Sequence, residues 1–131
     1  RDARLAGEAV VKDWAVVDDL AANPTKSLNL LDPVARDQAR AQMQTLLGTY
    51  AAKGLTQTGT SSLTDLQATT DDGKSFTVTA CVDVSGVDLV NEQGVSQVNP
   101  DRPEQQSFSY TVVKADGGFF VTRDSLKGSS C

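Results

Sequence analysis

Residues 74–86 read KSFTVTACVDVSG and alternate apolar with polar side chains. Side chains along a β-strand point to opposite faces in turn, so this period of two predicts a strand with one buried face. The residues expected on the buried face are Phe76, Val78, Ala80, Val82 and Val84. The residues expected on the opposite face are Thr77, Thr79, Cys81 and Asp83. One buried and one polar face is typical of a strand in an antiparallel sheet.

Turn sequences around this strand predict hairpins. The tetrapeptide DDGK at 71–74 is a strong hairpin signal, and it joins the strand to a polar strand within residues 55–70. The stretch QSFSYTVV at 106–113 alternates in the same way and leads through ADGG to another strand from Phe119. A short strand, a turn and a proline-bracketed loop are expected between the two hairpins. We expect Phe108, Tyr110 and Val112 to be buried with the first set.

The first half of the chain has helical periodicity instead. Apolar residues recur at steps of three and four at Leu5, Ala9, Val10, Trp14, Val17 and Ala21. Lys12, Asp13 and Asp19 are expected away from the centre of this stripe, and Pro24 ends the helix.

A second helix is predicted from Pro33, with Asp32 as its N-cap and Gly54 at its end. Its apolar stripe comprises Ala39, Met43, Leu46, Leu47 and Tyr50.

Helices followed by hairpin-linked strands predict an α+β protein. We expect two or three N-terminal helices packed on one face of a curved antiparallel sheet of four to six strands. A chain of 131 residues has the size of one domain. Residues 1–54 would form its helical half and residues 55–131 its sheet half.

The charge distribution bears on the partners. The net charge is −5, and residues 55–131 carry all of the imbalance, with five basic and ten acidic side chains. Nucleic acids and anionic lipids bind basic surfaces, and no basic cluster is present in the sequence, so neither is expected as a partner. No apolar run is long enough to span a membrane. Membrane attachment is therefore expected only through an anchor upstream of Arg1.

The two cysteines are placed so that a bond would be useful. A bond between Cys81 and Cys131 would close a loop of 50 residues, and chain entropy then predicts about 4 kcal/mol of stabilisation. A cysteine at a chain end is of structural value mainly when it is bonded. The alternative is two free thiols in a cytosolic protein. Pairing would indicate an oxidising compartment and hence an exported, extracytoplasmic protein.

The sheet half also carries a resemblance. The segments TACVDVSGVDLVNEQG, YTVV, GGFFVTRD and the terminal GSSC resemble small exported actinobacterial proteins, often lipoproteins. These have the cone-shaped fold of nuclear transport factor 2 and ketosteroid isomerase, also described as cystatin-like. The resemblance covers roughly residues 75–131, and the relatives often have tryptophan where Phe119 or Phe120 stands. It implies a Cys81–Cys131 pair and an exported or envelope-anchored location, and says little about chemistry.

No catalytic motif is found in the sequence. The chain has no histidine, which excludes catalytic triads and zinc sites that use imidazole. We expect no metal site and no cofactor. Proteins with this cone shape often hold an apolar pocket between helices and sheet, and the pocket candidates here are Trp14, Asp18, Tyr50, Phe108 and Tyr110. A catalytic carboxylate would have to be Asp18 or, from the strand, Asp83.

Two hypotheses for the function remain. The first is an exported, non-enzymatic binding or interaction module whose sheet contacts a protein partner; in a narrower form, it is the soluble part of a cell-envelope lipoprotein. The alternative is a protein with a pocket for a small apolar ligand, with or without isomerase-type carboxylate chemistry. An open pocket that contains an ionisable group would favour the second.

Overall fold

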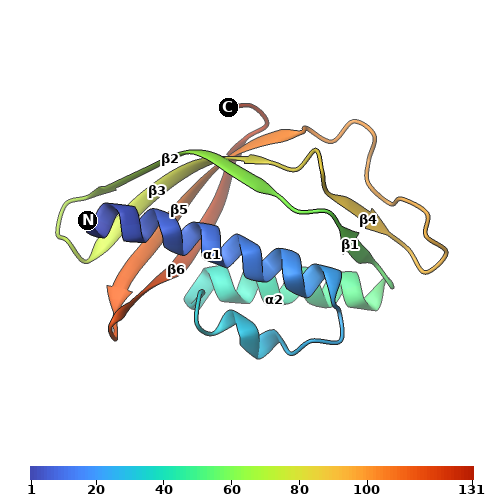
Figure 1. The fold of residues 1–131 in the computed structure, drawn as a ribbon, viewed down its shortest axis with the longest axis horizontal. Helices are drawn as coiled ribbons and strands as arrows, with labels where there is room; N and C mark the ends of the chain where they lie inside the picture. The colour runs from blue at the N-terminus through green and yellow to red at the C-terminus, as the bar shows by residue number, and fades with distance from the viewer.

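The computed structural model describes residues 1–131, in which two helices and a short 3-10 helix precede six strands (Figure 1). The helical elements are α1 (Asp2–Ala22), η1 (Leu28–Leu31) and α2 (Asp37–Ala52). The strands are β1 (Thr56–Thr58), β2 (Ser62–Thr70), β3 (Ser75–Asp83), β4 (Asp88–Val90), β5 (Gln105–Ala115) and β6 (Gly118–Gly128). None of the helices combines the length and apolar character needed to cross a bilayer.

The strands form two antiparallel sheets, and the predicted α+β fold is confirmed. The large sheet has the order β2-β3-β5-β6, and β1 pairs with β4 in a small sheet of its own. Figure 1 shows α1 lying across the large sheet with α2 beside it. In the register of β3 with β5, Phe76 lies opposite Val112 and Val78 lies opposite Tyr110. These four side chains are buried, so the predicted inner face of the sheet is correct.

The core has two parts that meet along α1. One lies between α1 and the large sheet and includes Val10, Phe76 and Val121. The other lies between α1, η1 and α2 and includes Leu20 and Leu31. Because α1 contributes to both, it connects the sheet to the helical layer.

The second helix begins later than predicted. Asp32 is the C-cap of η1, and α2 begins at Asp37. The chain between them lies along β6, where the Val121 N–H donates to the Val34 carbonyl at 3.0 Å and the Arg36 N–H donates to the Val121 carbonyl at 2.9 Å. An edge strand has unpaired backbone groups, and these two bonds satisfy some of them. Helical backbone through this segment would lose that pairing.

The buried face of α1 is also wider than predicted. Asp13, which was expected away from the centre of the apolar stripe, is only 3% exposed. The helix contacts all four strands of the large sheet, so side chains over a broad arc of its surface are covered. A carboxyl group is thereby enclosed between helix and sheet.

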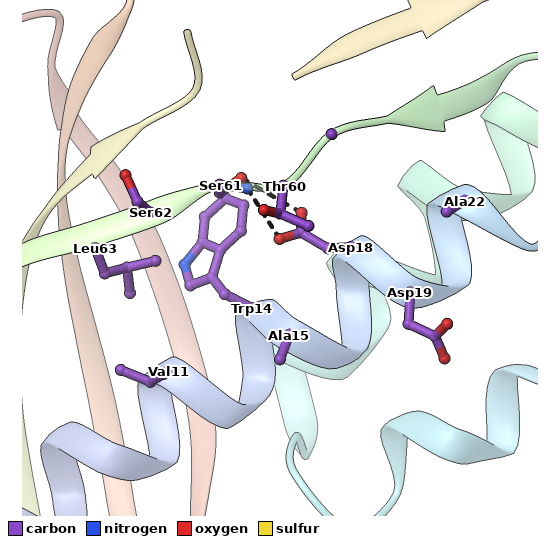
Figure 2. Close-up of a pocket in the computed structure, with 11 residues that line it drawn as sticks. Val11, Trp14, Ala15, Asp18, Asp19, Ala22, Thr60, Ser61, Ser62 and Leu63 are labelled. Carbon is purple, nitrogen blue, oxygen red and sulfur yellow. Dashed lines mark hydrogen bonds between the residues drawn. The ribbon is translucent and has the colours of Figure 1, made fainter. Parts of the chain in front are cut away.

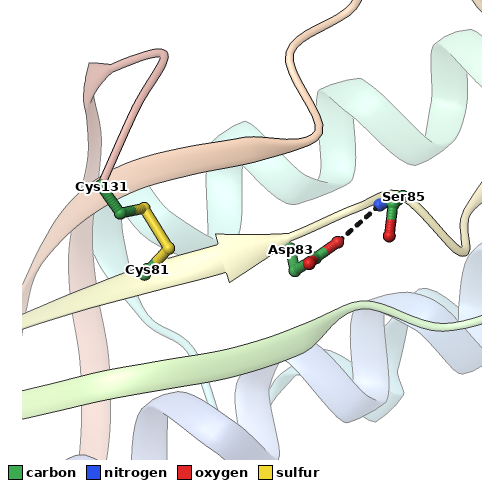
Figure 3. Close-up of a disulfide and its surroundings, with 4 residues drawn as sticks. All are labelled: Cys81, Asp83, Ser85 and Cys131. Carbon is green, nitrogen blue, oxygen red and sulfur yellow. Dashed lines mark hydrogen bonds between the residues drawn. A yellow bond between two sulfur atoms is a disulfide. The ribbon is translucent and has the colours of Figure 1, made fainter.

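A disulfide joins Cys81 on β3 to Cys131 (Figure 3). The Cα atoms are 5.7 Å apart, and no free cysteine remains. The predicted pairing is confirmed. It fastens the segment after β6 to β3, an inner strand of the sheet.

Candidate functional site

A cavity of ≈ 410 Å³ lies between α1, α2, the small sheet and the adjoining end of β5. Its apolar lining comprises Trp14, Val17, Met43, Leu46, Tyr50, Val84, Val87, Leu89, Val98 and Phe108. Its polar lining comprises Gln42, Gln57, Ser61, Gln97, Asn99, Arg102 and Gln106. Ligand pockets typically have such a largely apolar wall with a few polar groups that orient the ligand.

An aromatic cluster forms the inner wall of this cavity. The rings of Trp14 and Phe108 meet edge to face, with centroids 5.7 Å apart. The Trp14 indole Nε1–H donates a hydrogen bond of 2.6 Å to the Tyr110 hydroxyl, which lies deeper in the core. Tyr110 also stacks on Phe108 at 5.8 Å between centroids. These contacts fix the orientation of the Trp14 ring and present a rigid apolar surface to the cavity.

Arg102 and Tyr50 give the cavity a polar region. The Arg102 Nη2 atom donates to the carbonyls of Val84 at 2.8 Å and Val87 at 2.9 Å. Burial raises the pKa of Tyr50, and the positive charge of Arg102 partly offsets that rise. Arg102 is the only charged residue in the lining. Sequence analysis did not single it out; the one signal was its place between two prolines in the loop before β5.

A second hollow, of ≈ 570 Å³, lies on the other side of Trp14, between α1 and the connection from β1 to β2 (Figure 2). Asp18 lines it and accepts hydrogen bonds from the Ser61 N–H at 3.0 Å and from the Gln57 side-chain amide at 2.8 Å. Asp18 therefore anchors the β1–β2 connection to α1. Trp14 and Ser61 line both hollows and separate them.

The structure thus brings three of the five pocket candidates to one cavity. Trp14, Tyr50 and Phe108 line it. Asp18 lines the neighbouring hollow, and Tyr110 lies behind the wall formed by Trp14 and Phe108.

Asp83 lies apart from both hollows, on the outer side of β3 beyond the disulfide (Figure 3). Its carboxylate accepts a hydrogen bond of 2.8 Å from the Ser85 N–H. Hydrogen bonding by the Ser85 side chain, then by its backbone amide, lowers the pKa of Asp83. A lowered pKa keeps the carboxylate ionised and makes it a weak base.

A buried carboxyl pair was missed by sequence analysis. Asp13 on α1 and Asp124 on β6 are 3% and 7% exposed, and one oxygen of each, Oδ1, has no hydrogen-bonding partner. Burial raises the pKa of Asp13 to about 7, and the nearby charge of Asp124 contributes to the rise. Burial also raises the pKa of Asp124 and of Tyr110, which lies directly opposite Asp124 in the sheet. None of these three side chains lines the apolar cavity.

Comparisons with known proteins bear on the fold. No protein-family model matches the sequence, and no curated protein matches it. The structure is similar to that of the intermembrane space region of the chloroplast protein ARC6, with a TM-score of 0.68, 20% identity and 96% of each chain covered. It is also similar to Aln2 from a Streptomyces species, with a TM-score of 0.57, 12% identity, and 92% of this chain and 88% of that chain covered. The chain has the nuclear-transport-factor-2-like fold.

The structure is similar to a third one, that of a putative aromatic ring hydroxylase from Novosphingobium aromaticivorans. The TM-score is 0.58 at 14% identity, with 93% of this chain and 87% of that chain covered. At these identities the likeness concerns the fold alone.

Proposed function

We propose that the chain is an exported binding module whose apolar cavity holds a small, mainly apolar ligand. The observation that carries the proposal is the cavity of ≈ 410 Å³ lined by Trp14 and Phe108. Its volume lies within the roughly 300–1,000 Å³ of typical small-molecule sites. Burying an apolar ligand there would supply the main driving force for binding.

The Cys81–Cys131 disulfide supports the cellular address in this proposal. Disulfides persist in oxidising compartments and are rare in the reducing cytosol. An extracytoplasmic location, as a secreted protein or as the soluble part of a cell-envelope lipoprotein, is consistent with this bond. The envelope anchor and the actinobacterial origin rest on the sequence resemblance.

Binding without turnover is favoured by the placement of the carboxylates. No aspartate or glutamate lines the cavity. Asp18 is held by Gln57 and Ser61, and Asp83 lies on the far side of the sheet. An isomerase-type base needs contact with its substrate, and neither candidate has it in this geometry.

A protein partner on the open face of the sheet is the competing form of the proposal. That face presents cross-strand rows of small hydroxyl residues, such as Thr69, Thr77 and Thr111, and Thr79 beside Ser109. Interface centres are usually rich in aromatic residues, methionine and arginine. The hydroxyl rows lack that character, so the cavity is the better-supported binding site.

A cavity-filling variant tests the proposal. The neutral fluorescent probe N-phenyl-1-naphthylamine is expected to bind the purified chain, with energy transfer from Trp14, the only tryptophan. Val98 lines the cavity, whereas Val95, in the same loop, is 56% exposed. Val98→Phe should weaken probe binding about tenfold by occupying the space, and Val95→Phe should leave it unchanged. Failure of the natural chain to bind the probe, or equal effects of the two variants, would refute the proposal.

A further inference from the structure

We infer that the cavity takes an apolar molecule that ends in a carboxylate, with Arg102 binding the carboxylate. This inference rests on the proposed function, because it names the chemical class of ligand for the same cavity. It depends on the position, the bonding and the unbalanced charge of one side chain.

The position of Arg102 is fixed before any ligand binds. The residue lies between Pro100 and Pro103, which restrict the backbone of the loop. Its N–H donates to the Asn99 carbonyl at 2.9 Å. Two further bonds, from Nη2 to the carbonyls of Val84 and Val87, hold the guanidinium at the cavity wall. A preorganised donor loses little side-chain entropy when a ligand arrives.

The charge of Arg102 has no counter-ion in the protein. None of the five ion pairs includes it, and no carboxylate lines the cavity. Its Nε and Nη1 atoms make no hydrogen bond to another protein group, since both side-chain bonds come from Nη2. A partly buried charge without a partner is costly, and an anionic ligand would remove that cost. The chain as a whole has a net charge of −5, whereas the only charged residue that lines the cavity is positive.

The charge of the guanidinium favours a carboxylate. Its Nε–H and Nη1–H groups are free to donate to a carboxylate oxygen, and such charge-assisted bonds are stronger than neutral ones. A phosphate group carries a larger charge, for which the cavity offers no second cation. A single arginine at the edge of an apolar chamber therefore suits a monocarboxylate with a hydrocarbon or aromatic body.

Tyr50 supplies a second donor in the same cavity. Its hydroxyl has no hydrogen-bonding partner in the protein, and the side chain lines the cavity with Arg102. The raised pKa of Tyr50 keeps the hydroxyl protonated at neutral pH, so it can donate to an anion. The apolar body of the ligand would then contact Trp14, Leu46 and Phe108.

Matched ligands and variants test the inference. Calorimetry at neutral pH is performed with decanoate and with 1-decanol, which share a chain but differ in charge. Decanoate is expected to bind about ten- to a hundredfold more tightly. Arg102→Gln should abolish that preference while leaving 1-decanol binding largely unchanged. Tyr50→Phe should weaken decanoate binding by a smaller factor, and Arg123→Gln, on the exposed face of β6, should change neither.

Each outcome decides between the two proposals. Equal affinities for decanoate and 1-decanol would overturn the carboxylate inference and leave the apolar binding function intact. A preference for decanoate that survives both Arg102→Gln and Tyr50→Phe would overturn the role of these residues. If Arg102→Gln fails to fold by circular dichroism, the ligand comparison and Tyr50→Phe decide. Absence of binding by both decyl compounds and by the naphthylamine probe would overturn both proposals.

Discussion

Replacing Asp13 by asparagine should remove a loss of stability that the natural chain shows as the pH rises. The Asp13 carboxyl is enclosed between α1 and the sheet, close to Asp124, and its pKa rises from 3.8 to about 7 on folding. Between these two values the folded chain keeps a proton that the unfolded chain has released. The folded state therefore binds more protons, and the free energy of unfolding falls as the pH rises through this window.

The size of the effect follows from the same two values. A pKa difference of this size corresponds to at most about 4 kcal/mol, at about 1.4 kcal/mol per pH unit. This loss of unfolding free energy is absent below about pH 4, where Asp13 is protonated in both states. It is complete above about pH 7, where Asp13 is ionised in both states. An asparagine amide stays neutral throughout. Asp13→Asn should thus be close to the natural chain in stability at low pH and several kcal/mol more stable at about pH 8.

Urea unfolding followed by circular dichroism at a series of pH values measures this difference directly. Asp101→Asn serves as the control, because that carboxylate is exposed and makes no side-chain hydrogen bond. Its stability difference from the natural chain should stay small at every pH. If the difference between the natural chain and Asp13→Asn is the same at low and high pH, the burial of a titrating Asp13 is refuted.

The disulfide and one close backbone contact provide the remaining tests. Alkylation of the denatured, unreduced chain should add no alkyl group, and Cys81→Ser should lower the free energy of unfolding by about 4 kcal/mol because the bond to Cys131 closes a 50-residue loop. A loss below about 1 kcal/mol in urea unfolding would contradict this chain-entropy explanation. Gly59→Ala should be more destabilising than Gly73→Ala, because the added Cβ would lie 1.8 Å from the Gly86 carbonyl oxygen, whereas Gly73 has nothing within 4 Å. Both glycines have positive φ, so the control isolates the contact from the backbone strain of about 1–2 kcal/mol, and equal losses in thermal unfolding would show that the contact relaxes.

Local patterns in the sequence predicted much of the fold. The alternation around Phe76 and Val78 and the turn signals next to it depend on neighbouring residues only, and both appear in the structure as expected. The aromatic candidates Trp14, Tyr50 and Phe108 could be named because proteins of this fold often hold an apolar pocket between the helices and the sheet, and large aromatic side chains line such pockets. Their meeting at one cavity needed the structure.

The carboxyl pair could not be predicted, for two physical reasons. Helical periodicity gives the direction of Asp13 on α1, but the width of the covered arc depends on how the sheet surrounds the helix. On β6 an extra residue at Thr122 shifts the register between Val121 and Arg123. Such a bulge reverses the inward and outward faces beyond it, and it turns Asp124 toward the core.

The cavity arginine was missed for a different reason. Arg102 belongs to a loop, and loop conformation depends on distant contacts. In this chain, the carbonyls of Val84 and Val87 determine where its side chain lies.

The disulfide also determines how the chain would respond to mechanical tension. A force applied at Cys131 would pass through the sulfur bridge to Cys81 and load an inner strand, so β6 could not be peeled from the sheet end first. The 50-residue loop between the cysteines would stay locked, which withholds roughly 170 Å of extension until the bridge is reduced. In a stretched molecule, a thiol reductant would therefore allow the chain between the two cysteines to extend.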